Sequence, residues 1–313
     1  MQWVMRLLAL VVLVNVLGCF NERTILPIHM AENIRKTQSG RVFVTASEGL
    51  YELKITELND VEKPVLELVY ESTDCDYFAG LAELHNWLFF VCSQQQSFTF
   101  TGLTYKKSGR LIAYSLEDAS VKTVWDLERY QFANGIDVVP HFNYILLADE
   151  NFFGKGGVSR LEVDFSGDSP KIIGEEYHWI NKRHGVNAAN GVRVVEDSIF
   201  LTDLGYVKQL KVDTAWQQVE AAEILFTRLT VFDDFDLYCN GLLVADYLGG
   251  KLTWVPLDGS DSVDLVTGLT SPSAVLTDST PLFKQGDILF TESIGVLPNS
   301  GHRLALASLP PCN

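Results

Sequence analysis

Short apolar runs, rich in Val, Ile, Leu, Phe and Tyr, alternate with Gly, Asn, Asp and Ser along most of the chain. Apolar residues at helical spacing are scarce after the N-terminal segment. Apolar runs of this kind, bounded by turn residues, are typical of β-strands joined by short connections. The pattern therefore predicts an all-β protein.

A longer repeat groups these strands. In each unit a polar residue and a short apolar run are followed by a turn, by a second apolar run ending in a small or polar residue, and by a third run. The six units begin at Glu32, Phe78, Asn134, Asn190, Asp233 and Ser271, so their starts lie 38 to 56 residues apart. A period of about 40–50 residues is typical of a four-stranded propeller blade. A β-sandwich shows strands about every 8–12 residues without a longer period.

The repeat predicts a six-bladed β-propeller over residues 24–313. The segment "TILPIHM", residues 24–30, precedes the first unit. We expect this segment to add an outer strand to the last blade, because such closure removes the exposed sheet edges of an open ring.

The N-terminus has the pattern of an export signal. One Arg precedes an apolar stretch from Leu7 to Leu17, which is shorter than the about 17–25 residues of a membrane span. The following "VLGC" resembles the lipobox of bacterial lipoproteins. It implies a lipoprotein-type signal peptide over residues 1–18, a short tether over residues 19–23, and a lipid on Cys19 in the bacterial envelope (periplasm or outer membrane). The alternative is cleavage beside Gly18 and secretion, with Cys19 a free or intermolecular thiol.

The cysteine count agrees with export. Five cysteines leave one unpaired, and assigning Cys19 to a lipid leaves Cys75, Cys92, Cys239 and Cys312 for two disulfides. We expect pairing within one repeat unit, Cys75 with Cys92, and hence Cys239 with Cys312. The other two connectivities remain open.

Charge and motifs exclude several classes of function. The 40 acidic and 24 basic residues give a formal charge of −16, which repels phosphate backbones and anionic lipid surfaces. Nucleic acid is therefore not an expected partner, and membrane contact is expected only through a lipid on Cys19. The sequence also contains no G-x-S-x-G, H-E-x-x-H, C-x-x-C or Walker motif.

Oxygen-bearing residues recur at one point of the repeat. Glu32, Asn134, Asn190 and Asp233 each open a unit, and the innermost strands of a propeller begin at one end of its central channel. Two carboxylates and two amides suit a hard divalent cation such as Ca²⁺ or Mg²⁺. The pattern therefore predicts a metal site at the channel mouth.

The Asn-Gly pairs also permit a second interpretation. Asn-Gly between apolar runs is typical of a hairpin turn. However, the residues "NKRHGVNAA" before Asn190 are polar and small rather than strand-like. We therefore expect Asn190 to begin an inner strand, with the turn at Glu196 and Asp197.

The repeat units resemble those of the regucalcin (senescence marker protein)/gluconolactonase family, whose relatives include paraoxonases and strictosidine synthase-like proteins. The segments that carry the resemblance are "AENIRKTQSGRVFVT", "FANGIDVVPHFNYILLAD", "ANGVRVVEDSIFLTD" and "DDFDLYCNGLLVADY". The resemblance implies a metal centre, usually Ca²⁺ or Zn²⁺, and hydrolysis of a small lactone or ester. The implied ligands are Glu32, Asn134, Asn190 and Asp233, with Asp233 also the base; Asp-Asp replaces the commoner Asp-Gly, which leaves Asp234 as an alternative ligand.

Two further features enter the hypothesis. His184 lies six residues before Asn190, on a connection expected above the same channel end, and is a candidate catalytic residue; a solvated loop histidine is the alternative. The polar stretch from Ser93 to Gly109 is a candidate substrate lid or partner surface, or else a surface insertion. The predicted function is an exported metal-dependent lactonase or esterase. The alternative is a non-catalytic propeller that binds a ligand or a protein.

Overall fold

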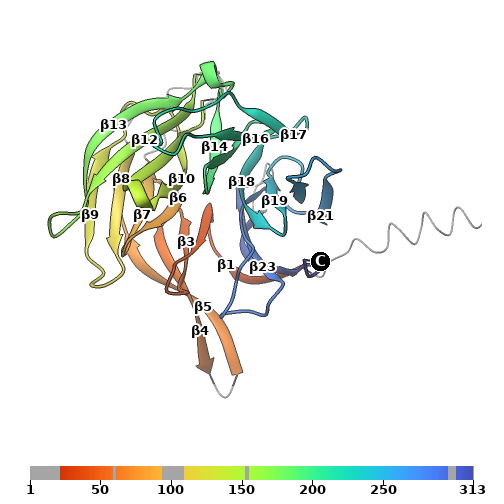
Figure 1. The fold of residues 1–313 in the computed structure, drawn as a ribbon. Helices are drawn as coiled ribbons and strands as arrows, with labels where there is room; N and C mark the ends of the chain where they lie inside the picture. Colours follow the sequence, from red (N-terminus) through yellow and green to blue (C-terminus); the bar gives the residue numbers. More distant parts are fainter. Residues whose placement is uncertain (1–21, 59–60, 94–108, 152–154, 295–300, 313) are drawn as a thin grey trace, which may run out of the picture.

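The computed structural model describes residues 22–58, 61–93, 109–151, 155–294 and 301–312. These residues form six four-stranded antiparallel sheets around a central axis, as the blades of a propeller (Figure 1). The predicted all-β, six-bladed propeller is confirmed.

The first three blades follow one another in chain order, each a simple up-and-down meander from the axis outward. Blade 1 comprises β2 (Asn33–Lys36), β3 (Val42–Ala46), β4 (Gly49–Leu58) and β5 (Val61–Glu71). Blade 2 comprises β6 (Tyr77–Leu84), β7 (Trp87–Ser93), β8 (Gly109–Ser115) and β9 (Val121–Asp126). Blade 3 comprises β10 (Ala133–Val139), β11 (Tyr144–Asp149), β12 (Gly157–Asp164) and β13 (Lys171–Ile180), with a 3-10 turn at Pro140–Phe142.

The last three blades repeat this arrangement. Blade 4 comprises β14 (Ala189–Val195), β15 (Ser198–Asp203), β16 (Tyr206–Lys211) and β17 (Glu223–Thr227), and a 3-10 turn at Lys182–His184 precedes it. Blade 5 comprises β18 (Phe232–Tyr238), β19 (Gly241–Asp246), β20 (Lys251–Pro256) and β21 (Val263–Thr267). Blade 6 comprises β22 (Pro272–Leu276), β23 (Asp287–Ile294), β24 (Gly301–Ser308) and β1 (Arg23–Pro27).

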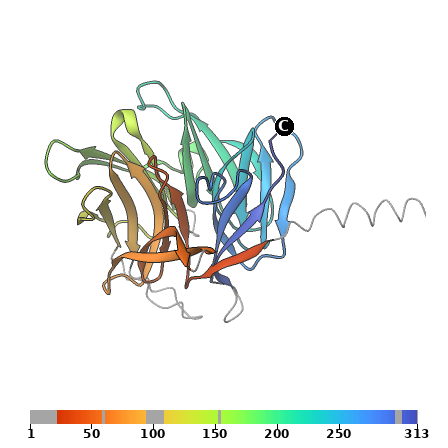
Figure 2. The same ribbon diagram turned by 90° about the horizontal axis from the view of Figure 1, so that it is seen from below.

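The N-terminal strand closes the ring. β1 pairs antiparallel with β24, with Thr24 opposite Ala305 and Pro27 opposite Arg303. Figure 2 shows β1 in red beside the blue strands of the last blade. The strand predicted from "TILPIHM" is therefore confirmed, and the two ends of the propeller are joined within one sheet.

The hydrophobic core is divided among the six gaps between neighbouring blades. Six buried clusters each draw residues from two adjacent blades, and one of them joins blade 6 to blade 1. Between blades 1 and 2, for example, the ring of Tyr70 packs edge-on against Phe78, 6.1 Å between centroids, and Phe78 lies 6.0 Å from Phe90. Both faces of each sheet are thus buried, which explains the continuous apolar runs in the inner strands.

Two disulfides link the cysteines as predicted. Cys75 is bonded to Cys92 within blade 2, and Cys239 is bonded to Cys312, which ties the C-terminal tail to blade 5. Disulfides persist in oxidising compartments, so the bonds indicate an exported protein. The predicted signal peptide and Cys19 lie outside the described residues, as do residues 94–108 of the candidate lid. Among the described residues, no helix is long and apolar enough to cross a membrane.

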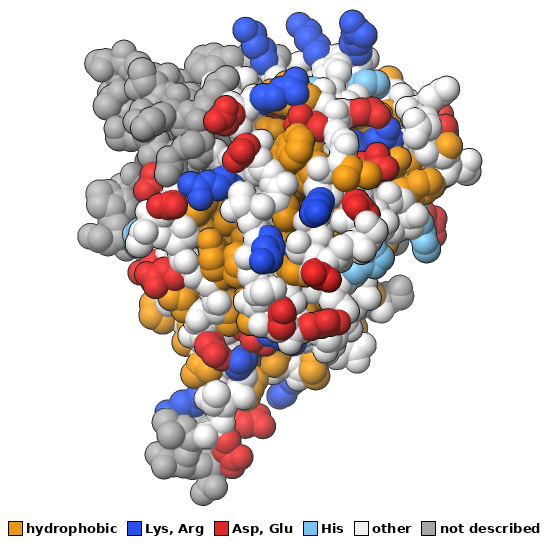
Figure 3. Space-filling view, turned by 90° about the vertical axis from the view of Figure 1, so that its left-hand side faces the viewer, with side chains coloured by type: hydrophobic (Ala, Val, Ile, Leu, Met, Phe, Trp, Pro, Cys, Tyr) orange, Lys and Arg blue, Asp and Glu red, His pale blue; other side chains and the backbone are white. Residues whose placement is uncertain are grey.

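The side of the disc over blades 2 and 3 carries mixed charge. Figure 3 shows acidic and basic side chains interspersed around a hydrophobic area on this side. The net charge of −16 is therefore not gathered into one acidic face there.

Candidate functional site

The first and second strands of each blade bring their polar ends to the same end of the channel. Antiparallel pairing places the start of an inner strand opposite the end of its neighbour: Ala133 faces Asp149, Ala189 faces Asp203, and Phe232 faces Asp246. Residues that open the first strand and residues that follow the second strand therefore meet at one channel mouth.

The structure brings the four predicted site residues together at this mouth. Glu32 lies directly before β2, and Asn134, Asn190 and Asp233 are the second residues of β10, β14 and β18. Their exposed fractions are only 3–7%. The amide of Asn134 hydrogen-bonds the Glu32 carboxyl, and that of Asn190 hydrogen-bonds the Asp233 carboxyl. Four blades thus contribute one oxygen-bearing side chain each, and the role of these residues as metal ligands stays a prediction.

A bulge in the inner strands of blades 3, 4 and 5 aims Asn134, Asn190 and Asp233 into the mouth. The strand register shifts between Ala133 and Ile136, between Ala189 and Val192, and between Phe232 and Phe235. Each shift spans one of the site residues. A bulge re-aims a side chain without ending the strand, which is the local reason that these polar residues leave the ladder.

The glycines of the Asn-Gly pairs allow neighbouring inner strands to approach. A Cβ atom on Gly135 would lie 2.2 Å from the carbonyl oxygen of Asn190, and one on Gly191 would lie 2.8 Å from Asp234 Oδ1. The pairs are therefore not turns. The turn of blade 4 lies at Glu196, which has a φ of 54°, and Asp197, as predicted.

The loops around the mouth are held by acids that end the second strands. Asp149 accepts hydrogen bonds from the backbone N–H of Gln131 (2.9 Å) and Phe132 (2.8 Å). Asp203 accepts bonds from the backbone of Asn187 (3.1 Å) and Ala188 (2.7 Å). These contacts fix the entry to β10 and β14, directly before the two site asparagines. They give the recurrent strand-ending Asp of the sequence a structural role.

Four more residues lie at the mouth that the sequence analysis did not single out: Tyr77, Glu150, Tyr247 and Ser293. Tyr77 and Ser293 hydrogen-bond the Glu32 carboxyl. Besides burial, the negative charges of Glu32 and Asp233 act on the Tyr247 hydroxyl and contribute to raising its pKa. Glu150 Oε2 accepts a hydrogen bond of 3.1 Å from Asn190 Nδ2. Glu150 and Tyr247 each follow an acid that ends the second strand of a blade, and Ser293 follows Glu292 near the end of β23, so the phase of the second strand was the signal that would have identified them.

Burial disfavours the charged forms of the acids at the mouth. It raises the pKa of Glu32 to about 6, although hydrogen bonds to this carboxyl, foremost the one from Tyr77, act to lower the pKa. It raises the pKa of Glu150 to about 8. Burial also raises the pKa of Asp233 well above its usual value, and the charges of Glu32 and Glu150 add to the shift. Three acids that repel one another in a desolvated site are stabilised in their charged forms by a cation.

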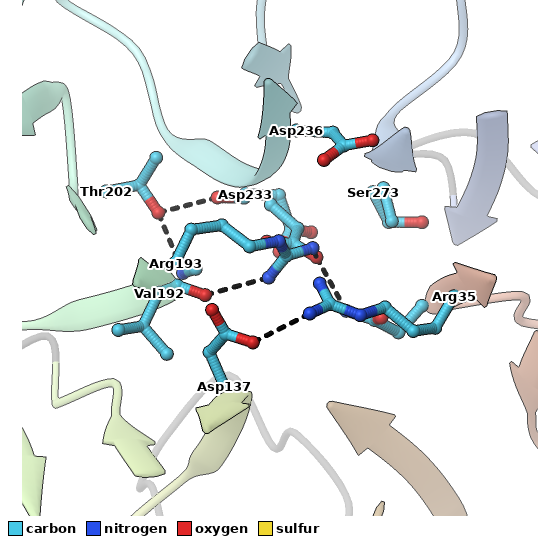
Figure 4. A network of polar contacts seen from close by, with 12 residues as sticks. Arg35, Asp137, Val192, Arg193, Thr202, Asp233, Asp236 and Ser273 are labelled. Carbon is cyan, nitrogen blue, oxygen red and sulfur yellow. Dashed lines mark hydrogen bonds and ion pairs between the residues drawn. The ribbon is translucent and has the colours of Figure 1, made fainter. Parts of the chain in front are cut away.

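A network of ion pairs crosses the channel below the mouth (Figure 4). Arg193 Nη2 lies 2.7 Å from Asp234 Oδ2, and the same oxygen accepts a 2.7 Å hydrogen bond from Asn33 Nδ2. Arg35 Nη2 lies 2.7 Å from Asp137 Oδ1. These contacts connect the inner strands of blades 1, 3, 4 and 5 across the channel.

This network separates the two adjacent aspartates. The Asp234 carboxylate is held by Arg193 and Asn33, whereas the Asp233 carboxyl interacts with Asn190 at the mouth. The backbone oxygen of Asp233 also accepts a 2.6 Å hydrogen bond from Thr202 Oγ1. The geometry therefore favours Asp233 over Asp234 as the mouth residue.

The donor set at the mouth fits a hard cation. In the described part of the chain, no three His, Cys, Asp or Glu side chains are grouped so that they could hold a metal by themselves. An ion here would have to share the amide oxygens of Asn134 and Asn190. Among the described residues, Asn190 Oδ1 and Glu150 Oε1 are buried without a hydrogen-bond partner, and unpartnered buried oxygens are costly unless a ligand satisfies them.

The hydrogen bonds of His184 are local and do not involve the four mouth residues. It ends the 3-10 turn Lys182–His184, and its Nδ1 accepts a 3.2 Å hydrogen bond from the Asn181 backbone N–H in a capping box. Its backbone oxygen accepts a bond from Ala222, at the approach to the outer strand β17. The structure therefore gives His184 a local capping contact, and its catalytic role stays a prediction.

Comparison with known proteins rests on structure alone. No protein-family model and no curated protein matches the sequence. A gluconolactonase from Xanthomonas campestris superposes with a TM-score of 0.62 at 12% identity, covering 94% of this chain and 91% of that chain. The fold is that of a gluconolactonase-like six-bladed propeller.

Other propellers of this type are similarly close. The soluble aldose sugar dehydrogenase of Escherichia coli gives a TM-score of 0.61 at 11% identity, covering 92% of this chain and 99% of that chain. A luciferin-regenerating enzyme gives 0.60 at 11% identity, covering 92% and 95%. Different chemistries thus share the gluconolactonase-like fold, and function has to be argued from the channel mouth.

Proposed function

We propose that the protein is an exported, metal-dependent hydrolase that opens a small lactone or ester at the channel mouth. The observation that carries this proposal is the unpartnered, buried Oδ1 of Asn190, which lies among oxygen-bearing side chains from three other blades. A divalent cation held by Glu32, Asn134, Asn190 and Asp233 would satisfy that atom and offset the buried carboxylates. All-oxygen ligands favour Ca²⁺, with Mg²⁺ or Zn²⁺ as alternatives.

The residues of the mouth have distinct parts in such a reaction. When bound, the cation would polarise the substrate carbonyl. The Asp233 carboxylate takes a proton from water as the water oxygen bonds to the carbonyl carbon. The ring C–O bond then breaks, and the proton passes from Asp233 to the departing alkoxide oxygen. Tyr77 and Ser293 hold the Glu32 carboxyl in place.

The structural neighbours support this class of substrate. Their names include a gluconolactonase, whose substrate is a sugar lactone, and aldose sugar dehydrogenases, whose substrates are sugars. A small molecule is therefore the proposed substrate of this mouth.

Metal content and hydrolysis test the proposal together. We expect the purified protein to bind Ca²⁺ and to hydrolyse at least one of a panel of aldonolactones, acyl lactones and aryl esters. Asn190→Ala and Asp233→Ala should lower kcat/KM by at least about 100-fold, because each removes an oxygen that stabilises the reacting centre. Asn86→Ala, in an exposed turn at the other end of the inner strand β6, is the matched control.

The outcomes separate two functions. A protein that binds no metal and leaves the whole panel intact in added Ca²⁺ contradicts the hydrolase. Metal binding without hydrolysis supports the alternative, a propeller that binds a ligand or protein without catalysis.

We also propose a lipid on Cys19 and a place in the bacterial envelope. The two disulfides support export, and the "VLGC" motif supports lipidation. Mass spectrometry of the mature N-terminus is expected to show a diacylglyceryl-modified Cys19. An unmodified Cys19, or a mature chain that begins elsewhere, would show secretion by ordinary cleavage instead.

A further inference from the structure

We propose that Glu150 is a positioning residue that turns the two site asparagines so that their amide oxygens face the centre of the mouth. This inference rests on the proposed function, because it assigns the oxygens of Asn134 and Asn190 to the cation. Glu150 follows β11 directly, and the hydrogen bond from its backbone N–H to the Phe132 carbonyl oxygen, 2.9 Å, fixes its place beside β10.

The contacts of the Glu150 side chain point to the amides. Oε2 accepts the 3.1 Å hydrogen bond from Asn190 Nδ2, and the carboxyl also interacts with the Asn134 amide. The residue is 3% exposed, and none of the ion pairs in the described part of the chain involves it. The charged form of a buried carboxyl is unfavourable without a cationic partner, so an ion at the mouth would compensate Glu150 where the fold's own ion pairs do not.

The neighbouring acid shows what a structural carboxylate looks like in this blade. Asp149 accepts two backbone N–H bonds and pairs with His178 Nε2 at 2.9 Å. By contrast, Glu150 Oε1 is buried and has no hydrogen-bond partner among the residues that the structure describes. One acid of the pair therefore anchors the loop, and the other serves the mouth.

The chemistry of an amide explains why such a residue is needed. The side chain of Asn carries a donor NH₂ group and an acceptor oxygen that differ little in shape. A rotation by half a turn would present NH₂ to a cation and abolish the ligand. A carboxylate that accepts from Nδ2 fixes the orientation and leaves Oδ1 free, as observed at Asn190. Partners of metal ligands commonly fix them in this way.

The test measures the ion rather than the reaction. Tb³⁺ substitutes for Ca²⁺ at oxygen sites, and Tyr77 and Tyr247 at the mouth can sensitise its luminescence. Lifetimes in H₂O and D₂O report the water bound to Tb³⁺, and calorimetry gives the Kd for Ca²⁺. For Glu150→Leu, which removes both the acceptor and the charge, we expect a Kd for Ca²⁺ that is larger by about 10–100-fold, as for other partners of metal ligands. We also expect more water on Tb³⁺, because amide oxygens leave the ion.

A second variant keeps the test valid if Glu150→Leu does not fold. Glu150→Gln keeps the size of the side chain and one acceptor oxygen, so we expect a smaller rise in Kd and an intermediate hydration. Glu52→Gln makes the same change at a buried acid paired with Arg41, remote from the mouth, and should leave both readouts unchanged.

The results distinguish this inference from the function beneath it. If the unaltered protein binds neither Ca²⁺ nor Tb³⁺, the proposed function fails. If the unaltered protein binds both ions, and the folded Glu150 variants have the same Kd for Ca²⁺ and the same amount of water on Tb³⁺ as the unaltered protein, the positioning role is overturned while the hydrolase proposal stands.

Discussion

At the scale of the residue, the mouth concentrates acidic groups where water cannot stabilise their charge. Glu32, Glu150 and Asp233 are buried, and burial raises the pKa of each. Several buried acids elsewhere pair with a cation: Asp234 pairs with Arg193, and Glu52 pairs with Arg41. Within the described residues, no ion pair compensates the three mouth acids, which distinguishes a binding site from the fold's own ion pairs.

These shifts predict how the stability of the metal-free protein depends on pH. The pKa of Glu150 rises from 4.5 to about 8, so between those values the folded state holds a proton that the unfolded chain has released. Stability therefore falls as pH rises through this window. His184 and His302, whose pKa values are lowered, act in the opposite sense below their ordinary value of 6.5. The fall is thus clearest between about pH 6.5 and 8.5.

Thermal melts in a chelator check this prediction. We expect Tm to fall by several degrees over the window, and Ca²⁺ to reverse the fall, since a cation stabilises the charged acids. Glu150→Gln, which removes the proton in question, should flatten the slope. A Tm that rises from pH 6.5 to 8.5 in the chelator would contradict the account.

At the scale of the element, the inner strands are bulged and closely spaced. The bulges release Asn134, Asn190 and Asp233 from the ladder, and the glycines beside the asparagines let adjacent strands approach. The Asn-Gly motif, which by local rules favours a turn, here serves the contact between neighbouring blades. Glycine is required at position 135 because a Cβ there would meet the backbone of the neighbouring blade, not because the chain turns.

A methyl group at this position should be costly. Gly135→Ala would place a Cβ 2.2 Å from a backbone oxygen of the next blade, so that backbone would have to move. We expect a loss of at least about 2 kcal/mol in the free energy of unfolding, typical of overpacking in a rigid core. Gly167→Ala, where a Cβ meets nothing within 4 Å, is the matched control and should stay within about 0.5 kcal/mol of the unaltered protein. Equal denaturation midpoints for the two variants would refute the packing argument.

At the scale of the whole molecule, a ring of blades has to be held closed. β1 completes blade 6, so the first described strand and the last share one sheet. The Cys239–Cys312 bond adds a covalent link between blade 5 and the tail that follows β24. A closed ring has no blade with an unpaired face, and its six inter-blade cores support one another.

The two disulfides should differ in their contribution. Cys239–Cys312 spans 73 residues and Cys75–Cys92 spans 17. The chain-entropy model then gives about 4 kcal/mol for the long loop and about 3 kcal/mol for the short loop. We expect the Cys239→Ser/Cys312→Ser protein to have the lower denaturation midpoint of the two double variants. Equal or reversed midpoints in urea would show that loop entropy does not govern these bonds.

The sequence by itself determined the repeat and, through it, much of the architecture. The phase of the apolar runs indicated six blades, the closing strand at residues 24–30, the turn at Glu196 and the convergence of Glu32, Asn134, Asn190 and Asp233. The sequence predicts these features because each depends on neighbouring residues, or on one local pattern that repeats in every blade around the central axis.

Only the tertiary structure decided which polar residues the mouth uses. It placed Asp234 with Arg193 below the mouth, gave His184 a capping contact, and brought Glu150 beside the amides of Asn134 and Asn190. In the sequence of a single blade, a polar residue after a strand cannot be distinguished from an ordinary turn residue. Its burial, and the absence of a cation for it, arise only when neighbouring blades close around it, since those contacts join residues far apart in the chain.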